Sequence, residues 1–553
     1  MSSCLQLLVI GLDGATFDVI QPLIEQGHLP VLARLMAEGT SGPLRSTLPP
    51  VSAPAWSTFM TGLNPGQHGI FQWRTYDPTK YTCLDERLMD SRRIAGRTFW
   101  DVLGDAGYKV AAITVPMTYP AWPVNGFLVS GYPCPDAKRN YTYPSQWAER
   151  LTEPYNFSAD YYLHASEDTI WRRGLEMLER RTSLAIELIE GEDVEVCVLV
   201  LGEIDRAQHD FWKYRDSRFP AYHTGAGQRY REVIAEHYQV SDAQVGRLLE
   251  HATEDTVVVV MSDHGGGPHP PHLFLTNAWL RDRGWLVRAS ATSAGISSAL
   301  RKVLGSIRRR LPFEERLRRV LPGRVVDGAR RLSMNIANVN WARTRAYRFP
   351  MYHPVEGIEL NVCGRQPKGV VEPGEEYETL REKIVAALQE VRAPNDGARV
   401  VREVYRREEL YSGPYLTIAP DIVFVTEPDY KAGSGLEGLI VTSAPWAEID
   451  KYSGLHTMDG IFVARGNSIR KGHRVSGMEI MDLAPTCIYA LDEAVPENMD
   501  GRVRTDVFLG PVAAERPVKY RGEPDWQPDE RPGLSEQEEE QMRDKLRGLG
   551  YLQ

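Results

Sequence analysis

The stretch "LQLLVIGLDG", residues 5–14, is an aliphatic run that ends abruptly in Asp13 and Gly14. Such a short apolar run is typical of a strand buried on both faces of a parallel sheet. Further runs of similar length and composition occupy residues 108–116, 194–205, 255–265, 421–428 and 459–466. We interpret all of these runs as buried parallel strands.

Segments with helical spacing of apolar residues lie between these runs, such as "PVLARLMAEG" at 30–39 and "GLEMLERRTSLAIELIE" at 174–190. Strands that alternate with helices favour a parallel sheet, because each parallel connection must cross the sheet. The sequence therefore predicts an α/β fold, with a mostly parallel central sheet and helices on both of its faces.

The composition narrows the class of protein. The chain has 553 residues, of which 42% are hydrophobic and 25% charged, and its net charge is −10. General nucleic-acid binding is not expected, because it needs excess positive charge to displace phosphate counterions. Six cysteines are scattered without a C-x-x-C pair, and no apolar run has the length of a membrane span. We therefore expect a cytoplasmic protein with reduced thiols, whose oligomeric state is left open.

A basic segment interrupts the alternating pattern at residues 286–345. Between Arg301 and Arg331 there are eleven basic and three acidic residues, a local charge of about +8. Apolar residues recur there at helical spacing, so we predict a helical insertion or cap. Contact of residues 296–332 with an anionic membrane surface or a partner is the alternative.

The remaining residues divide into a core and a C-terminal extension. We assign residues 1–285 and 346–512 to the core, and 513–553 to a C-terminal wrap and helix. Ser535 and Glu538 have the spacing of a capping box before the final helix. We expect this helix to dock on the core or to contact another subunit.

Candidate metal ligands follow three of the predicted strands. Asp13, Asp205 and Asp263 lie where these strands end, and the carboxyl ends of parallel strands are where open α/β sheets place their sites. Three histidines join them: His209 is four residues after Asp205, His264 is adjacent to Asp263, and His456 lies in "SGLHTMDG" at 453–460. Mixed carboxylate and imidazole ligands suit zinc or manganese better than magnesium or calcium.

These motifs resemble the alkaline phosphatase superfamily, and within it the type I phosphodiesterase/nucleotide pyrophosphatase family. "VIGLDG" at 9–14, "TGLNPGQHGI" at 61–70, the D-x-x-x-H pair, "SDHG" at 262–265 and "GLHTMDGIFVARG" at 454–466 follow the order of that family. "MDLAPTCIYALDEAVPENMDGR" at 481–502 resembles its closing helix and loop. The resemblance implies an alkaline-phosphatase-like fold and two divalent metal ions, with zinc as the first expectation and manganese as the second.

The resemblance also assigns the ligands and the nucleophile. The first metal would be held by Asp205, His209 and His456, and the second by Asp13, Asp263, His264 and Ser52. The nucleophile of the family lies nine residues before the threonine of a Thr-Gly pair, here Thr61 and Gly62, and this spacing reaches Ser52 in "PPVSAPAW", residues 49–56. Ser57 and Thr58 are rival hydroxyls, which we place in the first turn of a helix.

Two positions depart from related patterns. Trp73 occupies the position of an asparagine that holds phosphoryl oxygens in nucleotide pyrophosphatases, which weakens the case for nucleotide diesters. Trp56 replaces the arginine of the sulfatase motif, so sulfatase activity ranks low. Three further histidines are left outside the site: we expect His68 to bond to backbone, and His269 and His272 to be solvated.

The combined prediction is a metal-dependent phosphohydrolase. It would cleave small-molecule phosphate mono- or diesters through a phosphoserine intermediate on Ser52, as metal-assisted nucleophilic catalysis allows. A phosphomutase or phosphotransferase of the same superfamily, and a non-catalytic metal-binding scaffold, remain alternatives. Action on membrane phospholipid head groups is a further one.

Overall fold

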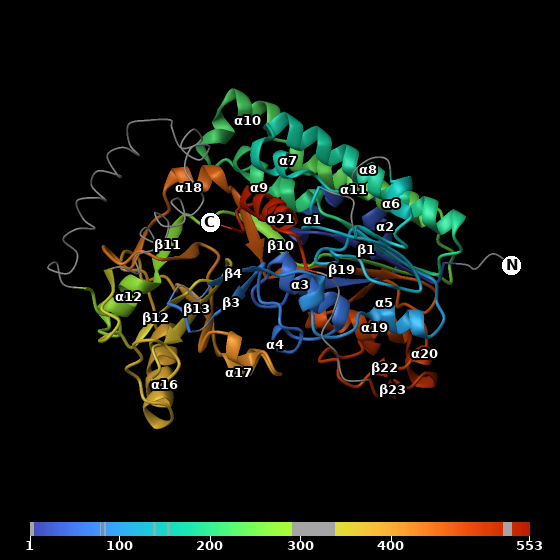
Figure 1. Cartoon of the computed structure of the whole chain (residues 1–553). Helices are drawn as coiled ribbons and strands as arrows, with labels where there is room; N and C mark the ends of the chain where they lie inside the picture. Colours follow the sequence, from blue (N-terminus) through green and yellow to red (C-terminus); the bar gives the residue numbers. More distant parts are fainter. Residues whose placement is uncertain are drawn as a thin grey trace.

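The computed structural model describes residues 5–77, 79–81, 84–136, 140–151, 155–289, 338–523 and 533–552. Its largest feature is a ten-stranded sheet that runs through the centre of the molecule (Figure 1). Along this sheet the strands are β20 (His473–Arg474), β2 (Thr40–Arg45), β19 (Asp459–Arg465), β9 (Val257–Met261), β1 (Leu7–Leu12), β8 (Val196–Leu201), β5 (Val110–Ile113), β6 (Gly126–Val129) and β7 (Thr142–Tyr143), with β21 (Met478–Glu479) beside β2.

The middle of this sheet is parallel. Strand β1 pairs in parallel with both β8 and β9, and β8, β5 and β6 continue in the same direction. All six residues of β1 and of β8 are buried, as the aliphatic runs predict. The predicted fold class is therefore confirmed.

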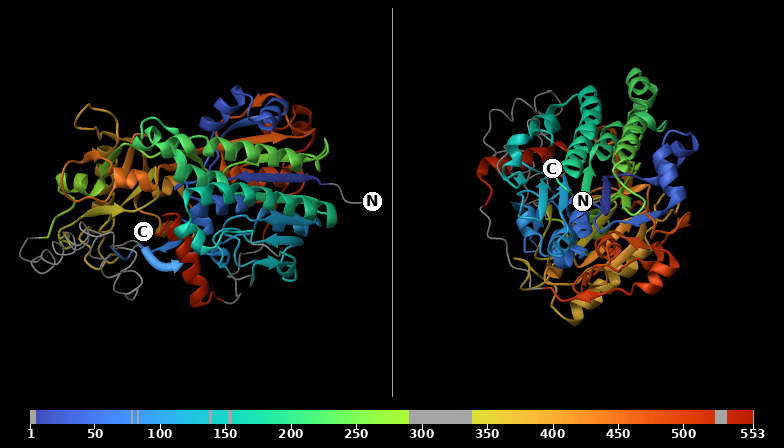
Figure 2. Two further views of the ribbon diagram at one scale, coloured as in Figure 1. Left: turned by 90° about the horizontal axis from the view of Figure 1, so that it is seen from above. Right: turned by 90° about the vertical axis from the view of Figure 1, so that its right-hand side faces the viewer.

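Helices cover both faces of the sheet. On one face lie α8 (Glu167–Gly191), α9 (Glu203–Arg215) and α11 (Val233–Leu249), which contact one another; α8 and α11 run side by side in Figure 2. On the other face α3 (Ser52–Thr61), α5 (Phe99–Asp105) and α19 (Leu483–Ala490) pack together (Figure 1). The sheet is thus shielded from water on both sides, as its apolar strands require.

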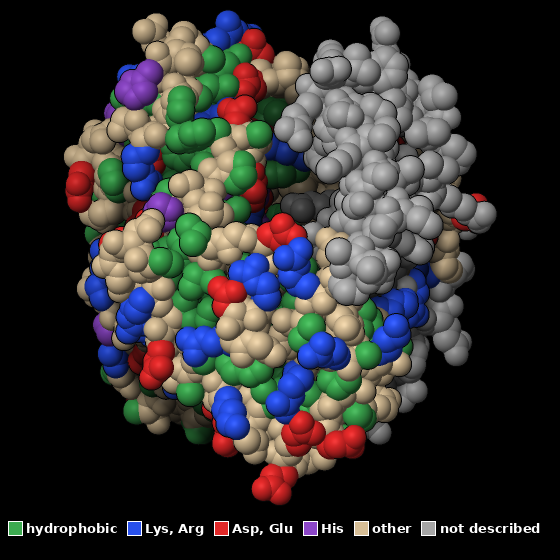
Figure 3. Space-filling view, turned by 90° about the vertical axis from the view of Figure 1, so that its left-hand side faces the viewer, with side chains coloured by type: hydrophobic (Ala, Val, Ile, Leu, Met, Phe, Trp, Pro, Cys, Tyr) green, Lys and Arg blue, Asp and Glu red, His purple; other side chains and the backbone are tan. Residues whose placement is uncertain are grey.

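A second unit with its own hydrophobic core lies beside the central sheet (Figure 1). Its antiparallel sheet has the order β12 (Ala346–Phe349), β13 (Val355–Leu360), β15 (Ile422–Thr426) and β14 (Val401–Arg406), and α16 (Glu375–Gln389) contacts β14. A smaller sheet has the order β16 (Tyr430–Gly433), β11 (His272–Leu275) and β17 (Val441–Ser443). Acidic and basic side chains are interspersed on the face of the molecule in Figure 3.

Two strand predictions are wrong in direction. Residues 421–428 contain β15, which is antiparallel to both of its neighbours in the second unit, not a strand of the central sheet. Residues 459–466 contain β19, which belongs to the central sheet but is antiparallel to β9 and β2. An apolar run indicates burial, but it does not encode the direction or the sheet of its partners.

The predicted insertion at 286–345 falls largely on residues 290–337, which lie outside the described residues. Its described flanks belong to the second unit: Leu286 and Val339 are in the second core, and Arg288 bridges to Val339. The second unit also contains strands from the segment 346–512 that the sequence assigned to one core.

The C-terminal extension docks on the central unit. Strand β23 (Tyr520–Arg521) pairs with β22 (Val495–Pro496), after α20 (Gly510–Glu515). Helix α21 (Glu536–Gly548) contacts α7 (Ala159–His164), and Met542 and Leu546 of α21 are buried in the main core. The predicted capping box of Ser535 and Glu538 is confirmed. Within the described ranges, no helix combines the length and apolarity needed to cross a membrane.

Candidate metal centre

Three aspartates meet at the carboxyl edge of the parallel strands. Asp13 directly follows β1, and Asp263 follows β9 after one residue. Asp205 follows β8 and lies in the first turn of α9. Because β1 lies between β8 and β9 in the sheet, the topology brings these carboxylates together, as the sequence predicts.

The histidines come from three different elements. His209 lies one helical turn after Asp205 on α9, so both side chains share a face. His264 precedes β10 (Gly265–Pro268), and His456 lies on β18 (Gly454–Thr457), which pairs with β10. This two-stranded pairing places His456 opposite Gly266, where a Cβ would be only 2.4 Å from the side chain of Gln208.

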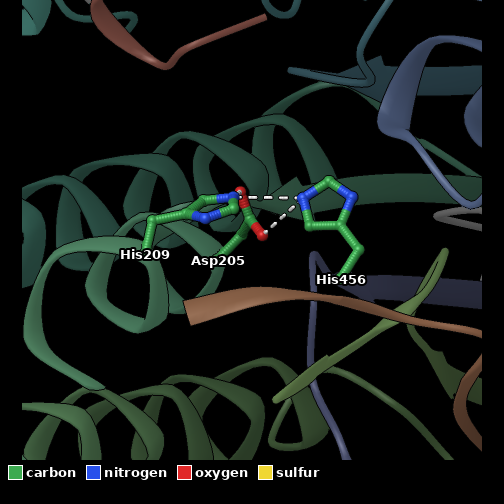
Figure 4. A group of neighbouring side chains, drawn as sticks. All are labelled: Asp205, His209 and His456. Atoms are coloured by element: carbon green, nitrogen blue, oxygen red, sulfur yellow. Dashed lines mark hydrogen bonds and ion pairs between the residues drawn. The ribbon is translucent and has the colours of Figure 1, made fainter. Parts of the chain in front are cut away.

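Asp205, His209 and His456 form the first group of potential ligands (Figure 4). The Nε2 atoms of His209 and His456 are 3.0 Å apart. The Asp205 carboxylate oxygens lie 3.4 Å from each of these nitrogens. All three side chains are buried, so their polar atoms converge in a place with little access to water.

The backbone fixes which imidazole nitrogen of each histidine faces inward. The Nδ1 atom of His209 donates to the Gly454 carbonyl at 2.7 Å, and that of His456 to the Pro50 carbonyl at 2.8 Å. A neutral ring that donates from Nδ1 keeps a lone pair on Nε2. Both rings are therefore held in the tautomer that, once the ring is neutral, presents an Nε2 lone pair to a metal cation.

A second group contains Asp13, Asp205 and His264. Asp263 joins its edge: His264 Nε2 is 3.3 Å from an Asp263 oxygen and 3.6 Å from an Asp13 oxygen. Asp205 thus contributes to both groups, whereas the resemblance assigned it to the first metal only. The two imidazoles of His264 and His456 stack with centroids 3.7 Å apart, which makes the two groups contiguous.

Three buried atoms of the second group have no hydrogen-bond partner: Asp13 Oδ1, Asp263 Oδ2 and His264 Nε2. Unsatisfied buried polar atoms are costly unless something else satisfies them. Oxygen and nitrogen atoms that point at one another without a donor between them are suited to a divalent cation. The residues present therefore fit a metal site.

The acidity of the aspartates reflects this crowding. Burial, together with the neighbouring carboxylates of Asp263 and Asp205, raises the pKa of Asp13 well above its usual value. Burial and the Asp205 charge raise the pKa of Asp263 to about 8. Burial also opposes ionisation of Asp205, but His209 and His456 hold its pKa well below the usual value. Without bound cations, there is too little positive charge nearby to keep all three carboxylates ionised.

Ser52 is the first residue of α3 and is buried. It lines the same cavity as Asp13 and Asp205, so the structure brings it to the predicted ligands. Pro54 lies inside the first turn of this helix. Ser57 and Thr58 lie deeper in α3, not in its first turn. The Ser57 hydroxyl donates to the Ala53 carbonyl, and that of Thr58 contacts His68 at 3.0 Å.

The two tryptophans pack around the site. Trp56 Nε1 donates to Asp13 Oδ2 at 3.0 Å, and its ring occupies the space that a Cβ on Gly11 would need. Trp56 thus positions a candidate ligand as well as filling the core. Trp73 is fully buried, and its ring packs against Tyr551 with centroids 5.3 Å apart.

Of the histidines left outside the site, His68 accepts a hydrogen bond from the Ile70 N–H at 3.1 Å, as expected. His269 was expected to be solvated, but it is buried, 3.8 Å from Glu448. His272 is half-buried in β11. Neither His269 nor His272 belongs to the two ligand groups found among the described residues.

Tyr551 is a residue of the site that sequence reasoning missed. Its phenol lies 3.4 Å from His456 Nε2, and Tyr551 lines the same cavity as Ser52. The sequence signal was slight: a glycine and an aromatic residue follow the last amphipathic helix, in "GLGYLQ" at 548–553.

The sheet and its two ligand groups define an α/β protein with candidate metal ligands at the carboxyl edge of its parallel strands. The family model for type I phosphodiesterase/nucleotide pyrophosphatase matches residues 7–448, and the chain therefore belongs to this family of phosphoester hydrolases. No curated relative matches the chain.

Solved structures similar to this chain include phosphonoacetate hydrolase from Sinorhizobium meliloti 1021 in complex with phosphonoacetate. It is 14% identical, with a TM-score of 0.49 over 89% of this chain and 96% of that chain. Human ectonucleotide pyrophosphatase/phosphodiesterase 5 is also 14% identical, with a TM-score of 0.48 over 91% and 99%. Its inactive murine counterpart in complex with AMP has 14% identity and a TM-score of 0.47 over 91% and 100%.

Proposed function

We propose that this protein is a two-metal phosphohydrolase that cleaves small phosphate esters through a phosphoserine on Ser52. The observation that carries this proposal is the convergence of Ser52 with two contiguous ligand groups at one edge of the sheet. A buried hydroxyl beside three carboxylates and three imidazoles suits phosphoryl transfer better than a structural role.

The chain's own groups divide between two cation positions. Asp205, His209 and His456 would hold one cation, and Asp13, Asp263, His264 and Ser52 the other, with Asp205 within reach of both. When bound, the two cations would neutralise phosphoryl charge and favour the ionised hydroxyl of Ser52. The mixture of nitrogen and oxygen ligands supports zinc first and manganese second.

Ser52 acts as the nucleophile that attacks phosphorus. Its hydroxyl loses a proton and forms the new O–P bond, while the bond to the leaving alcohol breaks and that alcohol takes up a proton. Water then attacks phosphorus in this intermediate and restores the Ser52 hydroxyl, which releases phosphate from a monoester substrate or the remaining phosphomonoester from a diester substrate. The N-terminus of α3, with its unpaired backbone N–H groups, favours negative charge beside Ser52.

The family and the site support a phosphate mono- or diester as substrate. A phosphotransferase would share the phosphoserine but pass the phosphoryl group to an acceptor alcohol instead of water. The cytoplasmic location, the absence of general nucleic-acid binding and the membrane contact of residues 296–332 stay predictions from the sequence.

Hydrolysis of bis-p-nitrophenyl phosphate and of p-nitrophenyl phosphate tests the proposal. Each is assayed after metal removal and after return of Zn²⁺ or Mn²⁺, with wild type, Ser52→Ala and Ser57→Ala. Ser57 is a suitable control, because it lies on the same helix but its hydroxyl bonds to backbone. We expect turnover that requires the metal, is lost in Ser52→Ala and persists in Ser57→Ala.

Equal turnover by Ser52→Ala and wild type would exclude the phosphoserine route. Turnover that does not depend on added metal would exclude the two-metal site. Nitrophenol release that rises with an added acceptor alcohol, with the phosphoryl group found on that alcohol, would favour the phosphotransferase.

A further inference from the structure

The end of the chain enters the candidate active site. Helix α21 ends at Gly548, and the residues that follow turn back into the protein, where Tyr551 and Leu552 are buried. Leu549 and Tyr551 line the cavity of about 60 Å³ that also contains Ser52, Asp13 and Asp205. Leu549 and Tyr551 therefore form one wall of the space beside Ser52.

The phenol of Tyr551 points at the reacting groups. It lies 3.4 Å from His456 Nε2 and lines the same cavity as Ser52. Its ring is held by Trp73 at 5.3 Å and Tyr352 at 5.6 Å between centroids. A buried phenol with such contacts has few orientations open to it, so its hydroxyl is fixed between a candidate ligand and the nucleophile.

Several contacts place the tail in this position. The Tyr352 hydroxyl donates to the Tyr551 carbonyl. Gly550 has φ of +83°, and a Cβ at this position would be 2.4 Å from the Tyr452 ring. Farther back, the buried Lys545 ammonium donates to the Cys134 carbonyl at 2.6 Å and pairs with Asp136 at 2.9 Å. Residues 545–551, here called the tail, are thus held against the protein at both ends of the segment, unlike a loosely attached terminus.

We propose that Tyr551 is a substrate-binding residue, whose phenol donates a hydrogen bond to a phosphoryl oxygen of the ester bound between Ser52 and His456. This inference rests on the proposed function of the same site. With the lone pair of His456 Nε2 engaged by a cation, the phenol proton needs another acceptor, and a phosphoryl group offers only acceptors. A hydrogen bond to a charged oxygen is the stronger kind.

The same wall restricts the direction in which the leaving group of the substrate can extend. The cavity beside Ser52 is small, and Tyr551 and Leu549 close it on one side. It has room for the phosphoryl group of an ester, so the leaving group must extend away from the C-terminal tail. Alternatively, the tail itself occupies this space as a plug that must withdraw before substrate binds. The activity of Tyr551→Phe separates a substrate-binding wall from such a plug.

The test compares Tyr551→Phe with Tyr489→Phe. Tyr489→Phe is the control, because it too removes the hydroxyl of a buried tyrosine. The Tyr489 hydroxyl donates to the Arg516 carbonyl at 2.8 Å, and Tyr489 lies in α19, outside the site. For each protein, KM and kcat are measured with bis-p-nitrophenyl phosphate. Calorimetric titration of the Zn²⁺-loaded protein with inorganic phosphate gives a second readout, and metal content and Tm are recorded alongside.

We expect Tyr551→Phe to lower kcat/KM by about tenfold to a hundredfold, the effect of losing a hydrogen bond to a charged group. The phosphate Kd should rise by about tenfold, with metal content and Tm as in wild type, and Tyr489→Phe should change neither Kd nor kcat/KM. If wild type binds phosphate but hydrolyses neither ester, the hydrolase proposal fails, while the phosphate titration still tests Tyr551.

Three outcomes would overturn the inference. Unchanged phosphate affinity in Tyr551→Phe would show that the phenol does not bind the phosphoryl group, and so would the absence of phosphate binding by loaded wild type. Higher activity of Tyr551→Phe than of wild type would identify the tail as a plug. A loss of bound metal in this variant would assign Tyr551 to metal retention instead.

Discussion

Asp205 lies within reach of both groups of candidate ligands, because it lies in the first turn of α9, at the centre of the carboxyl edge of the sheet. Its two oxygens face His209 and His456, and it also groups with Asp13 and His264. A single carboxylate in this position couples the two cation sites, so that its loss weakens both.

Asp205→Asn keeps the shape of the side chain but removes its charge. We expect bound zinc to fall from two ions per chain to one or fewer. We also expect kcat/KM to fall by at least about a hundredfold, because mutating a residue that only hydrogen-bonds to a metal ligand already lowers metal affinity or activity by about tenfold to a hundredfold. Metal analysis after dialysis measures this. Asp216→Asn, after the same helix, should retain both ions; full occupancy in Asp205→Asn would contradict the shared role.

The buried histidine His68 predicts how the free energy of unfolding responds to acid. Burial lowers the pKa of His68 from its ordinary value of 6.5 to about 3. The unfolded state therefore binds more protons than the folded state below about pH 6.5, so the free energy of unfolding falls as the pH is lowered toward 3. His68 alone should remove about 3 kcal/mol by pH 4.

Urea unfolding at a series of pH values tests this response. A His68→Gln variant loses the contacts of the imidazole, so its stability at pH 7 is lower, but its slope between pH 6.5 and pH 4 should be shallower than that of wild type. Parallel slopes for the two proteins would contradict a neutral buried His68.

The sequence predicted the convergence of Asp13, Asp205 and Asp263, because these residues follow aliphatic strands whose parallel ends must meet. It also ranked Ser52 above Ser57 and Thr58, from the resemblance alone. Tyr551 could not be predicted, because its place depends on how a remote helix docks. The sharing of Asp205 between two groups likewise depends on distances that no motif encodes.

At the scale of elements, α21 carries the end of the chain to the site. Its apolar stripe, Met542 and Leu546, is buried against the main core, and its first turn has a capping box. The sequence predicted this helix and its cap from local spacing. The directions of strands β15 and β19 were harder to predict, since they depend on pairing with segments far away in the chain.

Leu546→Ala should loosen the docking of α21. Removing a buried leucine side chain costs about 2–5 kcal/mol, and the cost should concentrate in this helix and the residues that follow it. Hydrogen exchange of residues 536–552 should speed up while β1 and β8 remain protected. Leu509→Ala, at a position that is 37% exposed, serves as the control. Uniform destabilisation of the whole chain would contradict a separate docking step.

At the scale of the molecule, the candidate metal centre joins segments that lie far apart in the chain. Its candidate ligands come from residues 13 to 456, and the strands of the second unit lie between His264 and His456 in the sequence. Cations that bind the folded chain should therefore stabilise the entire fold by linkage, and they relieve the repulsion between buried carboxylates.

Chelation should lower the Tm, and Zn²⁺ or Mn²⁺ should restore it. The gain is about 3 kcal/mol per site at a cation concentration a hundredfold above Kd. The Asp205→Asn protein should respond little. A Tm that is the same with and without chelator in wild type would contradict metal binding in the folded state.

The central claim is that Ser52 becomes covalently phosphorylated during turnover. The most direct measurement is rapid acid quenching of the metal-loaded protein with bis-p-nitrophenyl phosphate, followed by mass spectrometry of the peptide that contains Ser52. The account predicts a phosphorylated or nitrophenyl-phosphorylated Ser52, which is absent without metal and absent in Ser52→Ala. Turnover of this ester with an unmodified Ser52 peptide at every quench time would contradict it.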